Sequence, residues 1–460
     1  MDQMSHQVAR APKARHTFAA CLASALIALA LLLALPQTAE ATRLDTDMVL
    51  GQTASAQGIS EVDMPDLECH AAIVVGKDGT TYFERNADEE IKIASITKVM
   101  TAIVALEHAK LADTITVDEA AAKVGQSSAD LKEGDTMPLS TALKALLVTS
   151  GNDAAMAIAT TIGKKIDPAS ANPYKTFVEA MNTKAAELGM EHSLFENPHG
   201  LDFDGWEGEL HSSARDVATM YAYAMQNEDF RRIDADGDPM MVVKGADGAE
   251  RSIKILVRNE ILGQGGNIGG KTGGTYIALQ CFVGAFSQDA GGEIYTVTLG
   301  SDGSDQRWAD TRALANWYYG HTVDYPLVAS ERTTADGRPL IARVPNRAWS
   351  DKTVEVTATD PDAAVSLFNL AGKVELHPEY RAIDGGVRAG DTVGSLVVKQ
   401  AGKELGKVDL VSAENQDGPD PLSYLLVLID RAIRFFTGEP GQASAEEFFE
   451  TPDALALSAH

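Results

Sequence analysis

Residues 93–102 read IASITKVMTA, which places a serine and a lysine three residues apart at the start of an apolar helix. Residues i and i+3 of a helix lie on one face about 5 to 6 Å apart, so Ser95 and Lys98 are expected to touch. A serine becomes a good nucleophile when an uncharged amine accepts its proton. The amine must then lose about three units of pKa from ~10.4, through burial or a second cation. Because this spacing arises by chance about once in a chain of this length, its meaning depends on the rest of the sequence.

The charge of the chain limits its partners. The 460 residues, enough for two or three domains, include 39 basic and 66 acidic residues, which gives a formal net charge of -27. So negative a protein is not expected to bind nucleic acid or to dock on anionic lipid through charge alone.

The first 41 residues have the pattern of a secretory signal peptide. Basic residues precede an apolar run from Thr17 to Pro36, and a small-x-small triplet ends at Ala41. We expect export and cleavage after Ala41, and the length of the run leaves an uncleaved membrane anchor as the alternative. The mature chain keeps Cys69 and Cys281, for which two separate buried thiols are favoured over one disulfide.

Helix and strand patterns divide the mature chain. After a linker at 42–65, a β-hairpin leads into the Ser95 helix, helical segments follow, and strands return after residue 250. Strands at both ends with helices between them predict an α+β domain at 66–324, with a sheet built from both chain ends. Short alternating strands without helical periodicity predict a small all-β domain at 325–415.

The C-terminal segments differ from both domains. Residues 416–438 contain a predicted helix, 421–436, with leucine and isoleucine on one side. It is too short to span a bilayer, so it either lies in a membrane interface or docks on its own protein. Residues 439–460 are expected to form an acidic, disordered tail.

Residues 149–153, TSGND, break two apolar helices and present polar side chains at the break. Ser150 and Asn152 are candidates to face a cleft, although polar residues at such a junction also serve as ordinary helix caps.

Residues 269–275, GGKTGGT, run into a strand predicted at 276–286. Glycines on an edge strand let a ligand approach the backbone closely, and Lys271 and Thr272 offer a cation and a hydroxyl to a carboxylate. Residues 265–272 also fit the phosphate-loop pattern, but the lysine of that loop opens a helix rather than a strand. A nucleotide site is therefore not expected.

The order Ser-x-x-Lys, Ser-x-Asn and Lys-Thr-Gly is more specific than any one of these motifs. With it, the chain resembles the serine D-Ala-D-Ala carboxypeptidases, the low-molecular-mass penicillin-binding proteins. The likeness covers roughly residues 66–324 and includes SGNDAA at 150–155, FENPHGLD at 195–202, HSSARD at 211–216 and the pair Arg258-Asn259. It implies an antiparallel sheet flanked by a helical cluster, followed by a small all-β domain and an amphipathic helix.

The resemblance implies a role for each motif residue. Ser95 would attack the terminal D-Ala-D-Ala bond with Lys98 as general base, and Ser150 would relay a proton to the leaving D-alanine. The N–H groups of Ser95 and Gly274 would form the oxyanion hole. The implied substrate-binding residues are Asn152, Lys271, Thr272, Gly273, Gly274 and Arg307. Gly274 departs from the family, which usually has a bulky residue there.

The resemblance also implies an exported enzyme at the cell wall or the outer face of the cytoplasmic membrane. It would trim D-alanine from peptidoglycan stem peptides, be acylated by β-lactam antibiotics, and need no metal or cofactor. His199, Asp202 and His211 are expected to hold the fold.

Two alternatives remain for the function. A class A β-lactamase needs a glutamate four residues before an asparagine, a pair that residues 150–271 lack. A catalytically silent cell-wall-binding protein would show a damaged site, whereas every motif residue is present.

Overall fold

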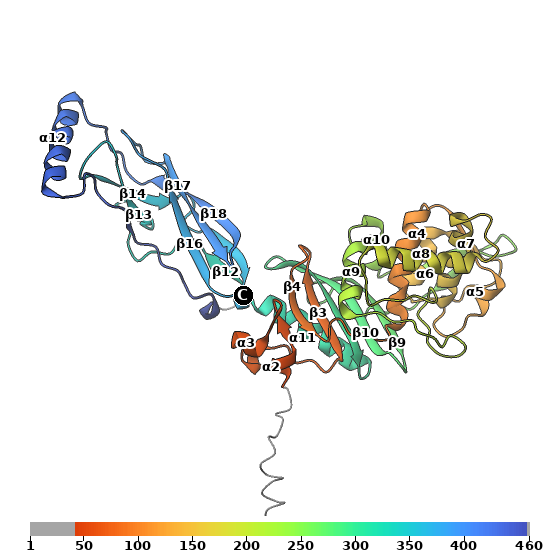
Figure 1. The fold of residues 1–460 in the computed structure, drawn as a ribbon. Coiled ribbons are helices and arrows are strands. Elements are labelled where there is room, and N and C mark those ends of the chain that lie inside the picture. Colours follow the sequence, from red (N-terminus) through yellow and green to blue (C-terminus); the bar gives the residue numbers. More distant parts are fainter. Residues whose placement is uncertain (1–41, 458–460) are drawn as a thin grey trace, which may run out of the picture. The chain divides into compact units, whose positions relative to one another are not determined.

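The computed structural model describes residues 42–457 (Figure 1), so the predicted signal at 1–41 lies outside the described residues. An antiparallel sheet of seven strands organises the N-terminal region, in the order β2-β1-β4-β3-β11-β10-β9. The strands are β1 (Met48–Val49), β2 (Gln52–Thr53), β3 (Ala71–Gly76), β4 (Thr81–Arg85), β9 (Asn267–Thr275), β10 (Leu279–Gln288) and β11 (Gly292–Ser301). Strand β3 pairs with β11, with Gly76 opposite Ile294. The predicted α+β domain, built from both chain ends, is confirmed.

Helices cover both faces of this sheet. The elements are a 3-10 turn, η2 (Ala94–Thr97), and the helices α4 (Lys98–His108), α5 (Glu119–Lys123), α6 (Leu139–Leu147), α7 (Asn152–Ile166), α8 (Pro173–Glu187), α9 (Ala214–Ala224), α10 (Glu228–Asp234) and α11 (Ser304–Gly320). Side chains alternate along β10: Phe282 packs with Trp308 of α11, and Val283 packs in the core that contains α4 and α9. Four short strands, β5 (Thr114–Thr116), β6 (Thr136–Pro138), β7 (Met240–Lys244) and β8 (Glu250–Lys254), form a separate small sheet.

The Lys-Thr-Gly stretch is itself strand β9, at the edge of the large sheet. The strand predicted at 276–286 begins only at Leu279, because residues 276–278 form the turn between β9 and β10. Lys271 therefore lies within a strand, which excludes a phosphate loop.

The predicted linker at 42–65 is wrong, because this segment is part of the fold. It contains α2 (Arg43–Thr46), α3 (Ala54–Gln57) and η1 (Glu61–Asp63), and β1 pairs with β4. The buried Asp47 carboxylate accepts a hydrogen bond from Arg85 Nε at 2.9 Å. Such a partner 38 residues away is not visible in a local pattern.

An all-β region follows the large sheet, as predicted. Its strands are β12 (Thr322–Pro326), β13 (Ala342–Pro345), β14 (Thr353–Ala358), β15 (Ala364–Phe368), β16 (Val374–Tyr380), β17 (Thr392–Gln400), β18 (Lys403–Ser412) and β19 (Glu446–Glu447), with short turns η3 (Asn369–Ala371) and η4 (Ala454–Ala456). They form a six-stranded sheet, β16-β17-β18-β14-β13-β19, and the pair β12-β15.

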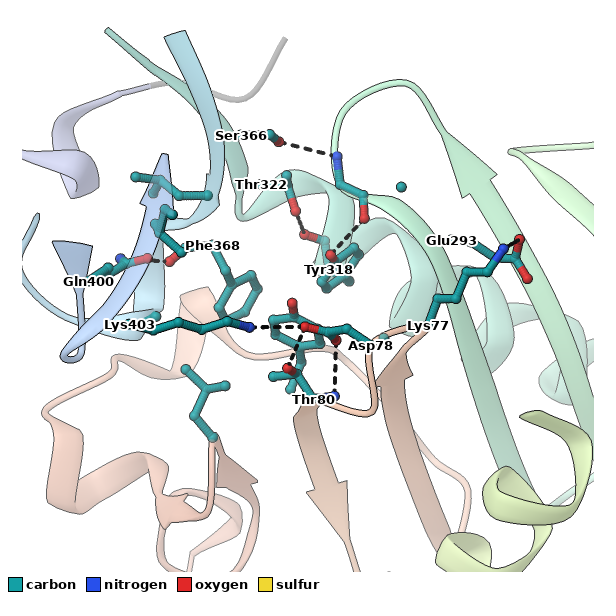
Figure 2. Close-up of a pocket in the computed structure, with 18 of the residues that line it drawn as sticks. Lys77, Asp78, Thr80, Glu293, Tyr318, Thr322, Ser366, Phe368, Gln400 and Lys403 are labelled. Carbon is teal, nitrogen blue, oxygen red and sulfur yellow. Dashed lines mark hydrogen bonds and ion pairs between the residues drawn. The ribbon is translucent and has the colours of Figure 1, made fainter. Parts of the chain in front are cut away.

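Contacts join this region to the turns of the large sheet around a hollow of about 590 Å³ (Figure 2). Lys403 Nζ lies 3.1 Å from Asp78 Oδ2. The Phe368 ring stacks on that of Tyr318, with centroids 5.7 Å apart. The residues of this aromatic contact and of the ion pair form part of the wall of the hollow.

The prediction of a disordered tail at 439–460 is wrong for residues 439–457, the part of it that the structure describes. Strand β19 pairs with β13, and the Arg332 guanidinium lies 4.2 Å from the centroid of the Phe448 ring. Tyr325 donates a hydrogen bond to the Pro452 carbonyl, and Ala454 is buried. The sequence did not reveal these few apolar contacts, because the acidic composition of the segment is typical of disorder.

Helix α12 (Pro421–Thr437) begins after Asp420, whose carboxylate accepts hydrogen bonds from two N–H groups of the first turn. Its exposed apolar side chains are Leu422, Leu425, Leu426, Leu428, Ile429, Ile433, Phe435 and Phe436. Within residues 42–457, no helix is long and apolar enough to cross a membrane.

Cys69 and Cys281 are both free and buried, which confirms the prediction of two separate thiols.

Candidate active site

Ser95 and Lys98 come together at the junction of η2 and α4, as the spacing predicts. Lys98 is fully buried, and its Nζ lies 2.8 Å from Ser95 Oγ. The backbone of Ala94 has a φ of +47°, in the left-handed region that non-glycine residues rarely occupy. The turn before the serine is therefore held in an unfavourable conformation by its surroundings, as is common at functional sites.

The surroundings of Lys98 Nζ suit an uncharged amine. Besides Ser95 Oγ, Nζ meets Asn152 Oδ1 at 2.8 Å and the carbonyl oxygen of His199 at 2.7 Å. These two oxygens can only accept hydrogen bonds, whereas a hydroxyl can also donate one. A neutral amine has two N–H donors for the oxygens and one lone pair, which then points to the Ser95 hydroxyl.

Burial and nearby cations favour the same neutral form. Burial lowers the pKa of Lys98 well below its usual value, and the positive charges of Lys271 and Arg258 lower it further, against an opposing effect of Asp153. A lysine with a depressed pKa can serve as a general base near neutral pH.

Ser150 and Lys271 form a second serine and lysine pair. Ser150 lies in the break between α6 and α7 with a φ of +66°, and Lys271 extends from β9. Lys271 Nζ donates to Ser150 Oγ at 2.9 Å and to the Thr272 carbonyl at 2.7 Å. A protonated lysine has three donors, so one remains for a ligand. Burial lowers the pKa of Lys271 to about 7, with Arg258 and Arg307 acting in the same direction.

Asn152 joins Lys98 to a neighbouring loop. While its Oδ1 accepts from Lys98, its Nδ2 donates to the Gly125 carbonyl at 3.0 Å. The next residue, Asp153, accepts hydrogen bonds from Ser128 Oγ at 2.6 Å and from the N–H of Leu131 at 3.1 Å. These contacts fix residues 125–131 beside the cleft.

The motif residues line one cleft of about 780 Å³. Its wall includes Ser95, Gln126, Ser127, Ser150, Leu256, Val257, Arg258, Glu260, Thr272, Gly273, Gly274, Gln280, Ser304 and Arg307. All nine predicted site residues thus lie in the cleft wall or, for Lys98, Asn152 and Lys271, hydrogen-bond directly to residues at the site. Although the chain is acidic, cationic side chains surround this cleft.

The space beside Gly274 is filled from the neighbouring strand. A Cβ on Gly274 would lie 3.0 Å from Gln280 Oε1, and this oxygen accepts a hydrogen bond from Arg307 Nη1 at 2.8 Å. Arg307 Nη1 also donates to the Gly273 carbonyl at 3.3 Å. A side chain at position 274 would therefore meet the Gln280 amide, which Arg307 holds in place.

Several residues of the cleft wall, among them Arg258, Glu260 and Gln280, were not identified from the sequence as site residues. Gln280 and Glu260 belong to no motif, and Arg258 occurred in a family-like pair to which no role was given. The charge of Arg258 depresses the pKa of both site lysines. No local signal marks these side chains, because only the folded chain brings them to the cleft.

The loop that contains His199 supports the Ser95 turn. Asn197 Oδ1 accepts hydrogen bonds from two N–H groups of this loop, at 3.2 and 2.6 Å. Gly200 packs against the turn so closely that a Cβ there would lie 1.9 Å from the Ala94 carbonyl oxygen. The His199 ring is buried against Trp206 rather than facing the cleft.

Gly200→Ala should displace the Ser95 turn. The acylation by β-lactams that the resemblance implies at Ser95 should then slow at least about tenfold, since small displacements of reacting groups are costly. The matched control is Gly205→Ala. Gly205 has a similar φ, +89° against +84°, but no atom lies within 4 Å of its added Cβ. The Gly205 variant should show only the loss of melting temperature caused by backbone strain, and equal reaction rates in both variants would contradict the supporting role of Gly200.

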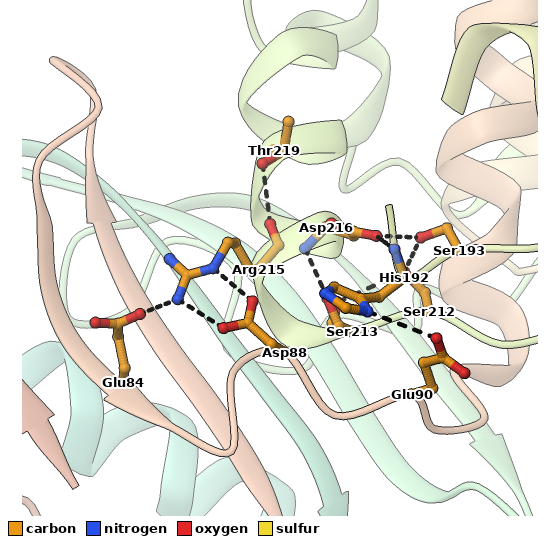
Figure 3. A network of polar contacts seen from close by, with 10 residues as sticks. All are labelled: Glu84, Asp88, Glu90, His192, Ser193, Ser212, Ser213, Arg215, Asp216 and Thr219. Atoms are coloured by element: carbon orange, nitrogen blue, oxygen red, sulfur yellow. Dashed lines mark hydrogen bonds and ion pairs between the residues drawn. The ribbon is translucent and has the colours of Figure 1, made fainter. Parts of the chain in front are cut away.

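A polar network ties the start of α9 to the large sheet (Figure 3). Arg215 Nε donates to Asp88 Oδ1 at 2.6 Å, and the same guanidinium pairs with Glu84. Asp216 accepts hydrogen bonds from the N–H of His192 and from Ser193 Oγ, both at 2.8 Å. The HSSARD stretch therefore holds the fold around the cleft.

The described residues contain no cluster of three or more histidine, cysteine, aspartate or glutamate side chains suited to a metal ion.

Comparison with known proteins identifies relatives of this chain. The family described as D-alanyl-D-alanine carboxypeptidase matches residues 55–303. The chain is 31% identical to D-alanyl-D-alanine carboxypeptidase DacB2 of Mycobacterium tuberculosis, over 57% of this chain and 87% of the relative. It is 24% identical to DacF of Bacillus subtilis, over 78% and 88%. The crystal structure of the Streptomyces K15 DD-transpeptidase superposes with a TM-score of 0.51 and 27% identity, over 55% of this chain and 97% of that chain.

Proposed function

Because this chain belongs to the D-alanyl-D-alanine carboxypeptidase family, we propose that its chemistry proceeds through an acyl-enzyme on Ser95. The chain is a serine-type hydrolase of that family, and it acts on peptidoglycan peptides ending in D-Ala-D-Ala. The observation that carries the residue assignment is the environment of Lys98 Nζ, with two obligate acceptors and the Ser95 hydroxyl around it.

Acylation begins with proton transfer from Ser95 Oγ to the lone pair of Lys98. The Oγ atom bonds to the carbonyl carbon of the penultimate D-alanine, and the negative oxygen accepts hydrogen bonds from the N–H groups of Ser95 and Gly274. The C–N bond then breaks as Ser150 gives its hydroxyl proton to the leaving amine, and Lys98 returns a proton to Ser150 and becomes uncharged again. In deacylation a water molecule gives a proton to Lys98 as its oxygen bonds to the acyl carbon. When the bond between this carbon and Ser95 Oγ breaks, Lys98 passes that proton to Oγ.

The cationic side of the cleft accounts for carboxypeptidase specificity. Lys271, Thr272 and Arg307 bind the C-terminal carboxylate of the substrate, and Asn152 binds a substrate amide. Glycines at 273 and 274 on an edge strand leave room for the substrate backbone beside β9. Intact mass of the protein with benzylpenicillin tests the proposal, since one drug molecule should remain bound per chain.

The enzyme works outside the cytoplasm, where its peptidoglycan substrate is assembled. The signal-like pattern at 1–41 supports export with cleavage after Ala41. The exposed apolar face of α12 supports contact with the outer leaflet of the membrane, in the headgroup region rather than across it.

Charge placed on α12 should release the protein from lipid. Leu425 and Ile429 are 53% and 49% exposed, so Leu425→Glu with Ile429→Glu should leave the fold intact. We expect purified residues 42–460 to float with zwitterionic vesicles and the double variant to remain in the soluble fraction. Val62→Glu is the control, because Val62 is 90% exposed and lies outside α12. Flotation of the double variant like wild type would exclude α12 as the membrane contact.

A further inference from the structure

Asp234 is a buried carboxylate that the proposed mechanism does not use. It ends α10 and is 5% exposed. Its Oδ2 accepts a hydrogen bond from the Tyr221 hydroxyl at 2.7 Å, and its Oδ1 finds no hydrogen-bond partner among the described residues. Burying a carboxylate with an unpaired oxygen destabilises a fold. Its presence behind the active site therefore needs a reason other than stability.

The carboxylate lies against the two residues that precede Lys271. A Cβ on Gly269 would lie 2.7 Å from Asp234 Oδ2, so only glycine fits there without a shift. The backbone N–H of Gly270 lowers the pKa of the same carboxyl. Strand β9 thus passes directly over Asp234 just before it presents Lys271 to the cleft.

The charges around Lys271 are otherwise cationic. Arg258 from the loop before β9 and Arg307 from α11 both lower its pKa. The charge of Lys271 in turn lowers the pKa of Lys98 in α4. Asp234 from α10 acts in the opposite direction, favouring the protonated lysine. Tyr221 from α9 faces the carboxylate and stabilises its ionised form through the hydrogen bond.

We propose that Asp234 is a positioning residue, which fixes strand β9 and keeps Lys271 protonated so that it can bind the substrate carboxylate and hold Ser150. The inference rests on the proposed function of Lys271. Asp234, a residue outside the three motifs, would thus control the pH range in which the enzyme works.

The test is Asp234→Asn, which keeps the shape of the side chain and removes its charge. Without the anion the pKa of Lys271 falls further, so the basic limb of the pH profile of kcat/KM should move to lower pH by about one unit. The profile is measured by D-alanine release from a diacetylated L-Lys-D-Ala-D-Ala peptide. The matched control is Asp310→Asn, because Asp310 is also buried but accepts hydrogen bonds from Ser301 Oγ, Gln306 Nε2 and the N–H of Glu68 rather than lying against β9.

Thermal unfolding separates this role from a structural one. Burial raises the pKa of Asp234 to about 6, above the usual aspartate value of 3.8. The stability that this residue contributes is thus full below pH 3.8 and is lost as the pH rises through about 6. Asp234→Asn should therefore melt at a higher temperature than wild type at pH 8, and this difference should shrink at pH 4.

The outcomes are distinct. A shifted basic limb in a variant that melts no lower than wild type supports the proposal. An unshifted limb, with or without a uniform loss of activity, overturns it, as does an equal shift in Asp310→Asn. If wild type releases no D-alanine and takes up no benzylpenicillin, the proposed function itself has failed, which is recognised before any variant is compared.

Discussion

Ser95→Ala will abolish covalent uptake of benzylpenicillin and will lower kcat/KM for D-alanine release at least about 10⁴-fold. Nucleophile replacements in serine hydrolases have effects of this size, because the residual rate comes only from binding and oxyanion stabilisation. Intact mass spectrometry over time measures the adduct directly. Wild type should show one drug molecule per chain that persists for many minutes.

The control for this experiment is Ser140→Ala, a serine on α6 outside the cleft lining. It should form the adduct at the wild-type rate. Rapid release of hydrolysed drug by wild type would instead indicate a β-lactamase, and Glu260, the carboxylate in the cleft wall, would be the residue to examine for water activation. An adduct that survives in Ser95→Ala would place the nucleophile elsewhere.

Lys98→Gln is expected to slow acylation of Ser95 at least about 10³-fold, the contribution of a well-placed general base. Glutamine can still donate to Asn152 Oδ1 or the His199 carbonyl, so the principal loss is the lone pair that accepts the serine proton. In wild type the acylation rate should fall as the pH drops through the depressed pKa of Lys98, because the ammonium form has no lone pair. The variant should lose this dependence.

Stopped-flow acylation by a chromogenic cephalosporin gives the rate at each pH. Lys92→Gln is the matched control, since Lys92 lies six residues before Lys98 but outside the cleft lining, where its Nζ donates to the Gly208 carbonyl at 2.6 Å. A wild-type acylation rate in Lys98→Gln would assign the base to another residue, with Lys271 the first to test.

The sequence predicts the fold class because its strong patterns lie in long elements. Apolar periodicity identified α4, α7 and α9, and strands at both ends of the region predicted the shared sheet. The errors fall where long-range contacts decide structure. Asp47 orders the 42–65 segment through Arg85, and Phe448 holds a tail whose composition suggested disorder.

The same contrast between local patterns and long-range contacts explains which site residues could be predicted from the sequence. The three motifs predicted Ser95, Ser150 and Lys271 as site residues, because each motif consists of particular residue types at a fixed spacing. Gln280 and Asp234 have no spacing signature, since each acts on a strand or arginine distant in sequence. The roles of these residues are predictions, and the variants above test those of Ser95 and Asp234.

The pairing of β3 with β11 joins residues more than 200 positions apart, such as Gly76 and Ile294. Closing so long a loop is slow, and topologies dominated by such contacts fold late. Ser95 and Lys98 meet within one local turn of the chain, whereas Lys271 joins them only when β9 to β11 complete the sheet. We therefore expect a chain that ends before β9 to be inactive however well its helices form.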